Sequence, residues 1–319
     1  MDERQLEILR ELGEQGSVQA VADALAITPS AVSQQLKLLQ REARVPLTRR
    51  VGRVLRLTPE GERLATAAID VQTAMSRARE IARGLATSPS GTVSICAFNS
   101  AALAFFAPLA IRFPTGGINV TFSDEDVAQD GFPPLTSRYD IVIAHRLQHT
   151  HTWPDQVVAE PLLQERLDVA LPADHPLTNR RSLRVKDVAQ QPWITTHHGF
   201  PVGATLESIA TAAGRPIEIR HHVNEFTVVA ELVRAGQGLA FLPRWTQPLP
   251  DGVVLRPLAD LSVSRVLDAL IRPENTARPA VSYVVAELKT IASALAGNPT
   301  ASSRRGRCPG FTEFEYDHL

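Results

Sequence analysis

The sequence has 319 residues, of which 44% are hydrophobic and 21% are charged, with a formal net charge of −1 at pH 7. This composition is typical of a folded soluble protein, and the length favours two or three packed units. The sequence has no apolar run of about twenty residues and no apolar segment behind its charged N-terminus, so we expect neither a membrane span nor a signal peptide and place the protein in the cytoplasm. Cys96 and Cys308 are too few for a disulfide framework.

Two short helices joined by a tight turn are predicted after a first amphipathic helix. Ser17 is a good N-cap for a helix over residues 18–25, and Thr28 followed by Pro29 begins a helix over residues 29–43. Proline is tolerated at the first helical position because its missing N–H would have no partner there. This pair of helices is typical of a helix-turn-helix.

The later helix of this pair presents a polar face beside a basic segment. Its outward residues are hydroxyls, an amide and a cation: Thr28, Ser30, Ser33, Gln34 and Lys37. Seven basic residues and one acidic residue lie between positions 37 and 56, so this window carries +6. An amide reads adenine with two hydrogen bonds, and hydroxyls and lysine reach bases or phosphates. An ordinary solvated face is the alternative, which the turn and the basic segment together disfavour.

A basic hairpin and a long helix follow. Two strand-like pieces around Val51-Gly52 predict a hairpin over residues 45–57, which would act as a wing on the phosphate backbone or in the minor groove. Thr58 and Pro59 then begin a helix whose apolar residues alternate at spacings of four and three: Leu64, Ala68, Val71, Met75, Ala78, Ala82 and Leu85. Such a seam favours dimerisation over packing against the helix's own chain. Residues 87–91 predict a hinge.

Strands and helices alternate from residue 91 to residue 296. Apolar strands are predicted over residues 93–98, 118–122 and 139–144, with a helix over residues 101–113. A second set of elements begins near residue 161, with strands over 167–171, 193–194, 217–221, 239–242, 253–255 and 265–271 and helices over 185–189, 204–213, 226–235 and 280–295. This alternation is typical of parallel sheets covered by helices.

Polar residues stand where several of these strands end. Ligand clefts in open α/β sheets lie at the C-terminal ends of strands. The residues predicted there are Asn99, Ser100, His145, Thr195, Thr196 and Thr227. Free N–H groups and a hydroxyl at the start of the helix at Asn99-Ser100 suit a carboxylate, so we expect an anionic metabolite as the ligand. The alternative is that these hydroxyls are simple helix caps.

Residues 1–90 resemble the DNA-binding domain of the LysR-type transcriptional regulators. The resemblance is carried by residues 16–22, 28–36, 50–53 and 56–61. It implies that the helix at 29–43 enters the major groove and that the long helix dimerises two chains. The implied contacts to bases or backbone fall on Thr28, Pro29, Ser30, Ser33, Gln34 and Lys37, and those of the wing on Arg50 and Arg53. The sequence departs from the family pattern after the recognition helix and in the wing, at Arg44, Thr48, Arg49 and Val54.

Residues 91–296 resemble the sensor domain of the same family, which is similar to periplasmic solute-binding proteins. The resemblance is carried by residues 160–162, 171–177 and 233–243. It implies a winged helix-turn-helix over 1–58, a linker helix over 59–90 and a two-lobed effector-binding domain over 91–296. The composition of residues 297–319 predicts a disordered tail. Lobe I would comprise 91–161 and 265–296, lobe II 162–264, and the crossover strands would lie near 160–163 and 264–270. One departure lies between Phe122 and Tyr139, where Pro133-Pro134 replaces a regular helix.

The sequence therefore predicts a transcriptional regulator that binds double-stranded promoter DNA as a homodimer or homotetramer and responds to a small-molecule effector. A solute carrier with an inert head is disfavoured because no signal peptide is expected, and an enzyme because no catalytic constellation is found. His145, His149 and His151 follow no standard ligand spacing, and neither do the histidine pairs at 197–198 and 221–222. We therefore expect no metal and no other cofactor.

Overall fold

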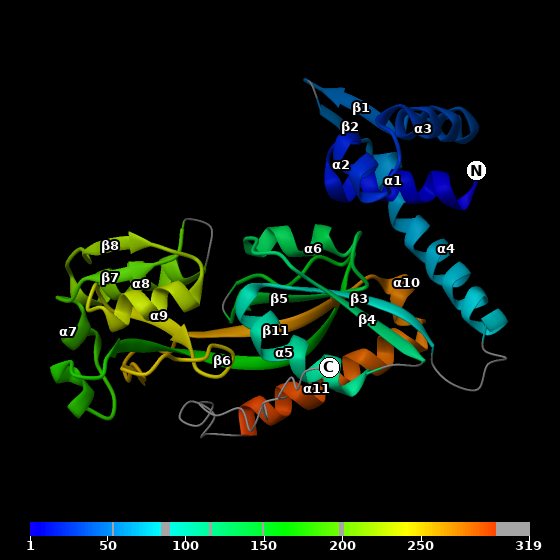
Figure 1. Cartoon of the computed structure of the whole chain (residues 1–319). Helices are drawn as coiled ribbons and strands as arrows, with labels where there is room; N and C mark the ends of the chain where they lie inside the picture. The colour runs from blue at the N-terminus through cyan, green and yellow to red at the C-terminus, as the bar shows by residue number, and fades with distance from the viewer. Residues whose placement is uncertain (53, 84–89, 115–116, 149, 198–200, 298–319) are drawn as a thin grey trace, which may run out of the picture.

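The computed structural model describes residues 1–52, 54–83, 90–114, 117–148, 150–197 and 201–297. The chain has three parts: a small helical head with a hairpin, a long helix, and an elongated α/β body of two lobes (Figure 1). The head lies over one lobe, and the other lobe extends away from it (Figure 1). This architecture is the fold class predicted from the sequence, with a winged helix-turn-helix head and a two-lobed α/β domain.

The head consists of three helices and a two-stranded hairpin: α1 (Glu3–Gln15), α2 (Val18–Ala24), α3 (Pro29–Ala43), β1 (Thr48–Val51) and β2 (Val54–Leu57). Ser17 and Thr28 cap α2 and α3, since their hydroxyls accept hydrogen bonds from the N–H groups of Ala20 and Ala31, the third residue of each helix. Ala26 in the turn and Arg44 after α3 adopt left-handed backbone, with φ of 51° and 57°. Arg44, one of the positions where the sequence departs from the family pattern, thus ends α3 in a left-handed conformation that glycine adopts more easily.

The long helix α4 (Pro59–Arg83) leaves the head directly after the hairpin. The Thr58 hydroxyl accepts a hydrogen bond from the N–H of Gly61 (3.1 Å) and donates one to the carbonyl of Pro46 (2.7 Å). Residue 61 must be glycine, because a Cβ there would lie 2.1 Å from the carbonyl oxygen of Leu47. This close approach seats the start of α4 against the start of the hairpin.

The predicted apolar seam on α4 is divided between two environments. Ala68 is fully buried, and Leu64 packs half-buried against the core of the head. Val71 and Met75, further along the seam, are 41% and 40% exposed. Leu85 lies outside the described residues. Packing against the chain itself therefore accounts for the first part of the seam and leaves an apolar stretch uncovered beyond it.

Lobe I contains strands in the order β4–β3–β5–β11–β6. β3 (Gly91–Ala97) pairs in parallel with β4 (Ile118–Asp124) and β5 (Ile141–Leu147), while β11 (Ser264–Ile271) is antiparallel to β5 and to β6 (Val158–Pro172). Helices α5 (Asn99–Arg112) and α11 (Pro279–Gly297) pack on this sheet. Between β4 and β5 lie only a 3₁₀ turn, η1 (Gln129–Gly131), and the one-turn helix α6 (Phe132–Leu135), in keeping with the two prolines there.

Lobe II is built around the C-terminal half of β6. This half pairs with β9 (Ala240–Pro243) and β10 (Val253–Arg256), and a separate parallel pair is formed by β7 (Trp193–Thr195) and β8 (Ile219–His222). The helical elements are η2 (Pro176–Asn179), α7 (Val185–Val188), α8 (Pro201–Ala213) and α9 (Phe226–Arg234). The strand predicted over 167–171 is the C-terminal part of β6, which continues without a break from Val158 to Pro172.

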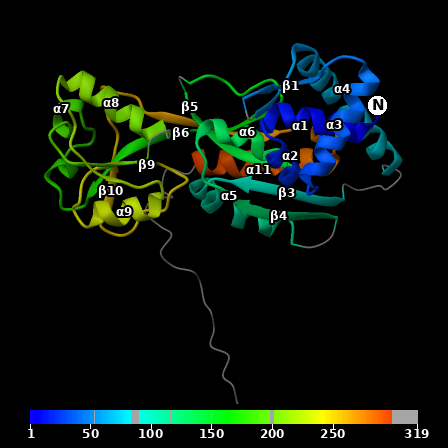
Figure 2. The same ribbon diagram turned by 90° about the horizontal axis from the view of Figure 1, so that it is seen from above.

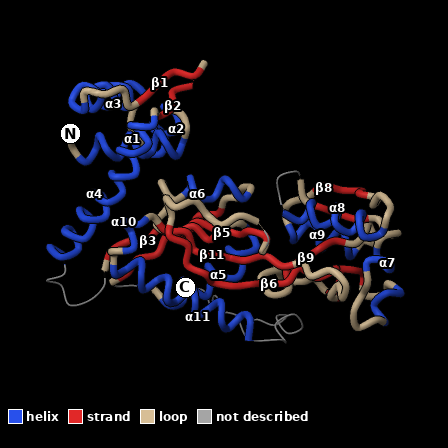
Figure 3. Tube along the Cα trace, turned by 180° about the vertical axis from the view of Figure 1, so that it is seen from behind, coloured by secondary structure: helices blue, strands red, loops and turns tan. Residues whose placement is uncertain are grey.

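β6 and β11 connect the two lobes. They pair in antiparallel register from Ser264 opposite Arg166 to Ile271 opposite Val158, with an irregularity after Leu267. Figure 2 shows from above, and Figure 3 from behind, that these strands run from one lobe into the other. The crossovers predicted near 160–163 and 264–270 lie within this pair. The two lobes are therefore joined by two continuous strands.

The terminal helix α11 is the one helix among the described residues long and apolar enough to be a candidate membrane span. Its buried residues pack into the core of lobe I, among them Val281, Val284, Leu288 and Ile291. Core helices of soluble proteins commonly meet the same test of length and composition. We therefore assign α11 to the core of lobe I.

Candidate functional site

The outward face of α3 carries the polar residues that the sequence analysis singled out. Thr28, Pro29, Ser30, Gln34 and Lys37 are exposed, and Ser33 is half-buried. The Thr28 hydroxyl, besides capping the helix, lies 3.0 Å from the Ser30 hydroxyl, and the Ser33 hydroxyl donates to the carbonyl of Pro29 (2.9 Å). The amide of Gln34 and the ammonium of Lys37 are therefore the long polar groups that this face offers to a partner.

The hairpin places further cations beside this helix. The amide oxygen of Gln40 in α3 accepts hydrogen bonds from the N–H groups of Leu47 (2.9 Å) and Thr48 (3.2 Å), which anchors the hairpin to the helix. Several exposed arginines form no ion pair with any described residue: Arg41, Arg44, Arg49, Arg50 and Arg56. Arg53, the other predicted wing contact, lies outside the described residues. Such unpaired cations, on the hairpin and at the C-terminal end of α3, suit a polyanion.

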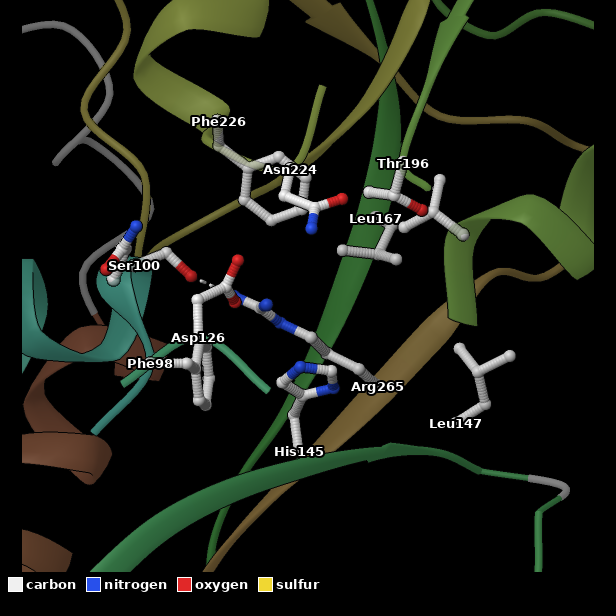
Figure 4. Close-up of a pocket in the computed structure, with 12 residues that line it drawn as sticks. Phe98, Ser100, Asp126, His145, Leu147, Leu167, Thr196, Asn224, Phe226 and Arg265 are labelled. Carbon is white, nitrogen blue, oxygen red and sulfur yellow. Dashed lines mark hydrogen bonds between the residues drawn. The ribbon is translucent and has the colours of Figure 1, made fainter. Parts of the chain in front are cut away.

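A pocket lies between the two lobes (Figure 4). Lobe I, β11 and lobe II all contribute side chains to its wall: Phe98, Asn99, Ser100, Asp126, His145, Leu147, Leu167, Thr196, Val202, Asn224, Phe226 and Arg265. The empty space between these side chains, including the mouth, is about 520 Å³. A pocket of mixed polar and apolar walls between two lobes is the usual setting for a small ligand.

Arg265 of β11 is the most highly coordinated polar side chain in the pocket. It is buried and donates hydrogen bonds to Glu165, at 3.0 and 3.1 Å, through Nη2 and Nε. Nη2 also donates to the hydroxyls of Ser100 (2.9 Å) and Thr246 (2.7 Å). The guanidinium lies 5.1 Å from the ring centre of Phe98. Nη1 has no hydrogen-bond partner among the described residues, so this end of the guanidinium is available to a ligand.

His145 is held as a neutral ring beside this cation. Its ring packs edge-on against Phe98 and Phe132, with ring centres 4.6 and 5.1 Å apart. Burial, together with the nearby Arg265 guanidinium, lowers the pKa of His145 to about 3. A neutral imidazole adds no charge to the pocket at physiological pH.

Two further polar side chains of the pocket are Thr196 and Asp126. The hydroxyl oxygen of Thr196 is buried and has no hydrogen-bond partner among the described residues, and Figure 4 shows this side chain facing the pocket. Asp126 stands opposite, and its pKa is raised by burial and by the Glu225 carboxylate, with a hydrogen bond to Asn224 acting the other way. A buried hydroxyl without a partner is costly, which indicates a position that a ligand or water satisfies.

Comparison with known proteins decides the family. The profile of the bacterial regulatory helix-turn-helix of the LysR family matches residues 3–62, and that of the LysR substrate binding domain matches residues 86–292. The chain is a LysR-type transcriptional regulator. The head is thus the family's DNA-binding unit, and the two-lobed body is a domain for a small-molecule effector.

Individual relatives agree with this assignment. The HTH-type transcriptional regulator TtuA of Agrobacterium vitis is 30% identical over 251 residues, which cover 74% of this chain and 79% of that protein. The regulator AlsR of Bacillus subtilis is 28% identical over 256 residues, covering 76% and 80%. A full-length OxyR structure from Pseudomonas aeruginosa is 18% identical, covers 91% of this chain and 95% of its own, and has a TM-score of 0.63. That likeness shows a shared fold.

The regulator's interlobe pocket gathers some of the predicted effector residues and leaves others out. Asn99, Ser100, His145 and Thr196 line it. Thr195 is buried without a hydrogen-bond partner for its hydroxyl but does not line the pocket. Thr227 lines a separate, more open groove together with Asn99 and Glu225.

Sequence reasoning missed Arg265, Asp126 and Asn224 as pocket residues. The sequence does carry a signal for Arg265, because a charged residue within the apolar strand 264–271 needs an ion-pair or hydrogen-bonding partner when it is buried. Asp126 and Asn224 lie in loops and carried none. Among the described residues, no group of three or more His, Cys, Asp or Glu side chains could hold a metal ion.

Proposed function

We propose that this LysR-type regulator recognises promoter DNA through α3 and the hairpin. Gln34 and Lys37 would contact base edges or phosphates in the major groove. The residues at the start of the helix would contact the DNA backbone where α3 enters the groove: Thr28, Pro29, Ser30 and Ser33. Arg50 and Arg53 of the wing would contact phosphates. The exposure of the α3 residues and the absence of ion pairs at the described arginines nearby support this proposal.

We propose that the effector binds in the interlobe pocket and carries an anionic group. The observation that carries this proposal is the buried Thr196 hydroxyl, which faces the pocket and has no partner among the described residues. The anionic group would accept hydrogen bonds from Nη1 of Arg265 and from Asn99 at the start of α5, where helix N–H groups also favour negative charge. Ser100 positions Arg265 through its hydroxyl.

The regulator would act as a homo-oligomer without enzymatic activity in the cytoplasm. The exposed seam residues Val71 and Met75 support dimerisation through α4. A dimer presents two recognition helices to two half-sites of one operator. Effector binding would then shift the arrangement of the two heads by favouring one lobe geometry. Neither metal nor cofactor enters this scheme.

A gel-shift titration of the full-length protein tests the DNA-binding proposal. The probe is the intergenic DNA upstream of the protein's own gene, compared with a scrambled duplex of equal composition at two salt concentrations. We expect preferential binding to the native duplex and weaker binding at the higher salt, because phosphate contacts release counterions. Equal affinity for both duplexes would contradict specific recognition of this operator.

A further inference from the structure

One short segment of lobe I contacts both the effector pocket and the head. Residues 132–137 comprise α6 and the two residues that follow it, on the side of lobe I that the head covers (Figure 1). The segment contains Pro133 and Pro134, where the sequence departs from the family pattern of a regular helix. Its first residue packs against the wall of the pocket, and its last residues contact α1 and Arg272.

Phe132 forms the pocket end of this segment. Its ring is fully buried and packs edge-on against two side chains of the pocket wall, with ring centres 5.1 Å from His145 and 6.0 Å from Phe98. A third edge-on contact is to the indole of Trp153, with ring centres 6.3 Å apart. Side chains in a close-packed core move together, so a ligand that shifts Phe98 or His145 also disturbs Phe132.

The last residues of the segment form its head end. The amide of Gln15 in α1 donates hydrogen bonds to the carbonyl of Pro134 (3.2 Å) and to the Ser137 hydroxyl (3.1 Å). The Thr136 hydroxyl accepts a hydrogen bond from Nε of Arg272, at 3.5 Å. Residues 132–137 thus touch α1 directly and also touch the buried arginine that pairs with α1.

The ionic contact that docks the head on lobe I is costly to bury. Two cations and three carboxylates meet there: Arg10, Glu11 and Glu14 of α1, Arg272, and Glu274 of α10 (Pro273–Thr276). One carboxylate is therefore in excess, and Nη2 of Arg10 is buried with no hydrogen-bond partner among the described residues. Because burying ions costs free energy that their pairing only partly returns, a small loss of packing beside this contact suffices to weaken docking.

Space for a displacement exists between the head and lobe I. A cavity of about 990 Å³, including its mouth, is lined by residues of both parts, among them Gly13, Glu14, Pro133, Pro134 and Trp153. Residues 132–137 therefore border open space on the side of the head. A small movement into this space does not require other core side chains to shift.

We propose that residues 132–137 couple the wall of the effector pocket to the docking of the head. The packing of Phe132 against His145 and Phe98 and the docked position of α1 stabilise one another, so an effector that shifts this wall weakens docking. This inference rests on the proposed effector site and names the segment that transmits its occupancy. Because the polar face of α3 is exposed in the docked head, release changes the orientation of α3 relative to lobe I.

Hydrogen–deuterium exchange of the full-length regulator, measured by mass spectrometry, tests the coupling from the pocket end. Phe132→Leu removes the ring that packs against the pocket wall. We expect exchange in α1 and α10, the two sides of the docking contact, to become about 5- to 150-fold faster. Phe105→Leu is the matched control, since Phe105 is equally buried in lobe I but has no ring contact with a described aromatic side chain. It should leave exchange in α1 and α10 unchanged.

Gln15→Ala tests the coupling from the head end without altering the core. It removes both hydrogen bonds from α1 to the segment. By linkage, exchange should become about 2- to 10-fold faster in the peptide that contains His145 as well as in residues 132–137. Gln19→Ala removes an exposed hydrogen bond to Asp23 within α2 and is the control, with no change expected at either place.

Two outcomes overturn the inference and leave the proposed function standing. One is a folded Phe132→Leu protein in which α1 and α10 exchange no faster than in Phe105→Leu. The other is a Gln15→Ala protein in which exchange rises at residues 132–137 but not around His145, and this variant decides the question if Phe132→Leu does not fold. Loss of the salt-dependent complex with operator DNA in the unmodified protein would instead contradict the proposed function itself.

Discussion

Arg265 and Arg272 stand at the two ends of strand β11, the first in the interlobe pocket and the second in the contact between lobe I and the head. Arg272 is buried, pairs with Glu11 of α1 and donates to Glu14 (2.6 Å). Arg10 of α1 reaches back to Glu274 of α10 (Pro273–Thr276) at 2.8 Å. One strand therefore connects the effector pocket to a buried ionic contact that docks the head.

Removing the cation of this contact should destabilise the docked protein. Arg272→Met leaves Glu11 buried without its partner, and such unpaired buried charges cost about 3–5 kcal/mol. Denaturant unfolding followed by tryptophan fluorescence and circular dichroism should show this loss. Arg220→Met removes an exposed pair with Glu218 and serves as the control, with a change below about 1 kcal/mol. Equal effects of the two variants would contradict the buried role of Arg272.

His145 should make the protein less stable in mild acid. Its pKa lies at about 3 when folded, below the usual value of 6.5, so the unfolded chain binds a proton that the folded chain excludes. The free energy of unfolding therefore does not depend on His145 above pH 6.5. As the pH falls from 6.5 toward 3, protonation of His145 in the unfolded chain lowers the free energy of unfolding by up to about 1.4 kcal/mol per pH unit.

Comparison of His145→Gln with the unmodified protein isolates this effect. The free energy of unfolding of the variant should fall less steeply between pH 6.5 and pH 4.5, a window set by the folded and unfolded pKa of His145. His151→Gln, which changes an exposed histidine, should follow the unmodified protein. Parallel curves for His145→Gln and the unmodified protein would refute the assignment.

Gln34 and Arg50 should affect DNA binding in different ways. Gln34→Ala should reduce discrimination between operator and scrambled duplex by about 1–3 kcal/mol, because a bidentate base contact is lost. Arg50→Ala should weaken binding to both duplexes alike and reduce the slope of log affinity against log salt by about 1. Fluorescence anisotropy across a salt series measures both quantities. A specificity loss for Arg50→Ala with an unchanged salt slope would assign the wing residue to base recognition instead.

The exposed part of the α4 seam should govern self-association. Val71→Asp with Met75→Asp places carboxylates where apolar side chains would be buried, and should weaken the dimer by at least about 3 kcal/mol. Sedimentation velocity over a concentration series measures the shift from dimer to monomer. Thr66→Asp, exposed on the same helix and off the seam, is the control. A dimer that survives the double substitution would require another interface.

The elements of the head followed from local signals in the sequence. Ser17, Thr28 and Thr58 each cap a helix through an N–H group at most three positions away, so their effect does not depend on the remainder of the fold. The left-handed conformation at Arg44 and the hairpin around Gly52 are local in the same sense. These short-range interactions explain why the head, its polar recognition face and the start of α4 could be predicted residue by residue.

The pocket depended on contacts between segments far apart in the chain. Asn99, Ser100 and Thr196 could be predicted because each follows a strand, and His145 because it lies near the end of β5, where ligand clefts of open α/β sheets form. Arg265 enters the pocket only because its partners Glu165, Ser100 and Thr246 come from both lobes. The hydrogen bond between Asp126 and Asn224 forms only where the lobes face each other. The charged groups of the pocket, and the Arg272 contact that docks the head, thus arise from tertiary packing, since their energy depends on burial and on partners that no local pattern specifies.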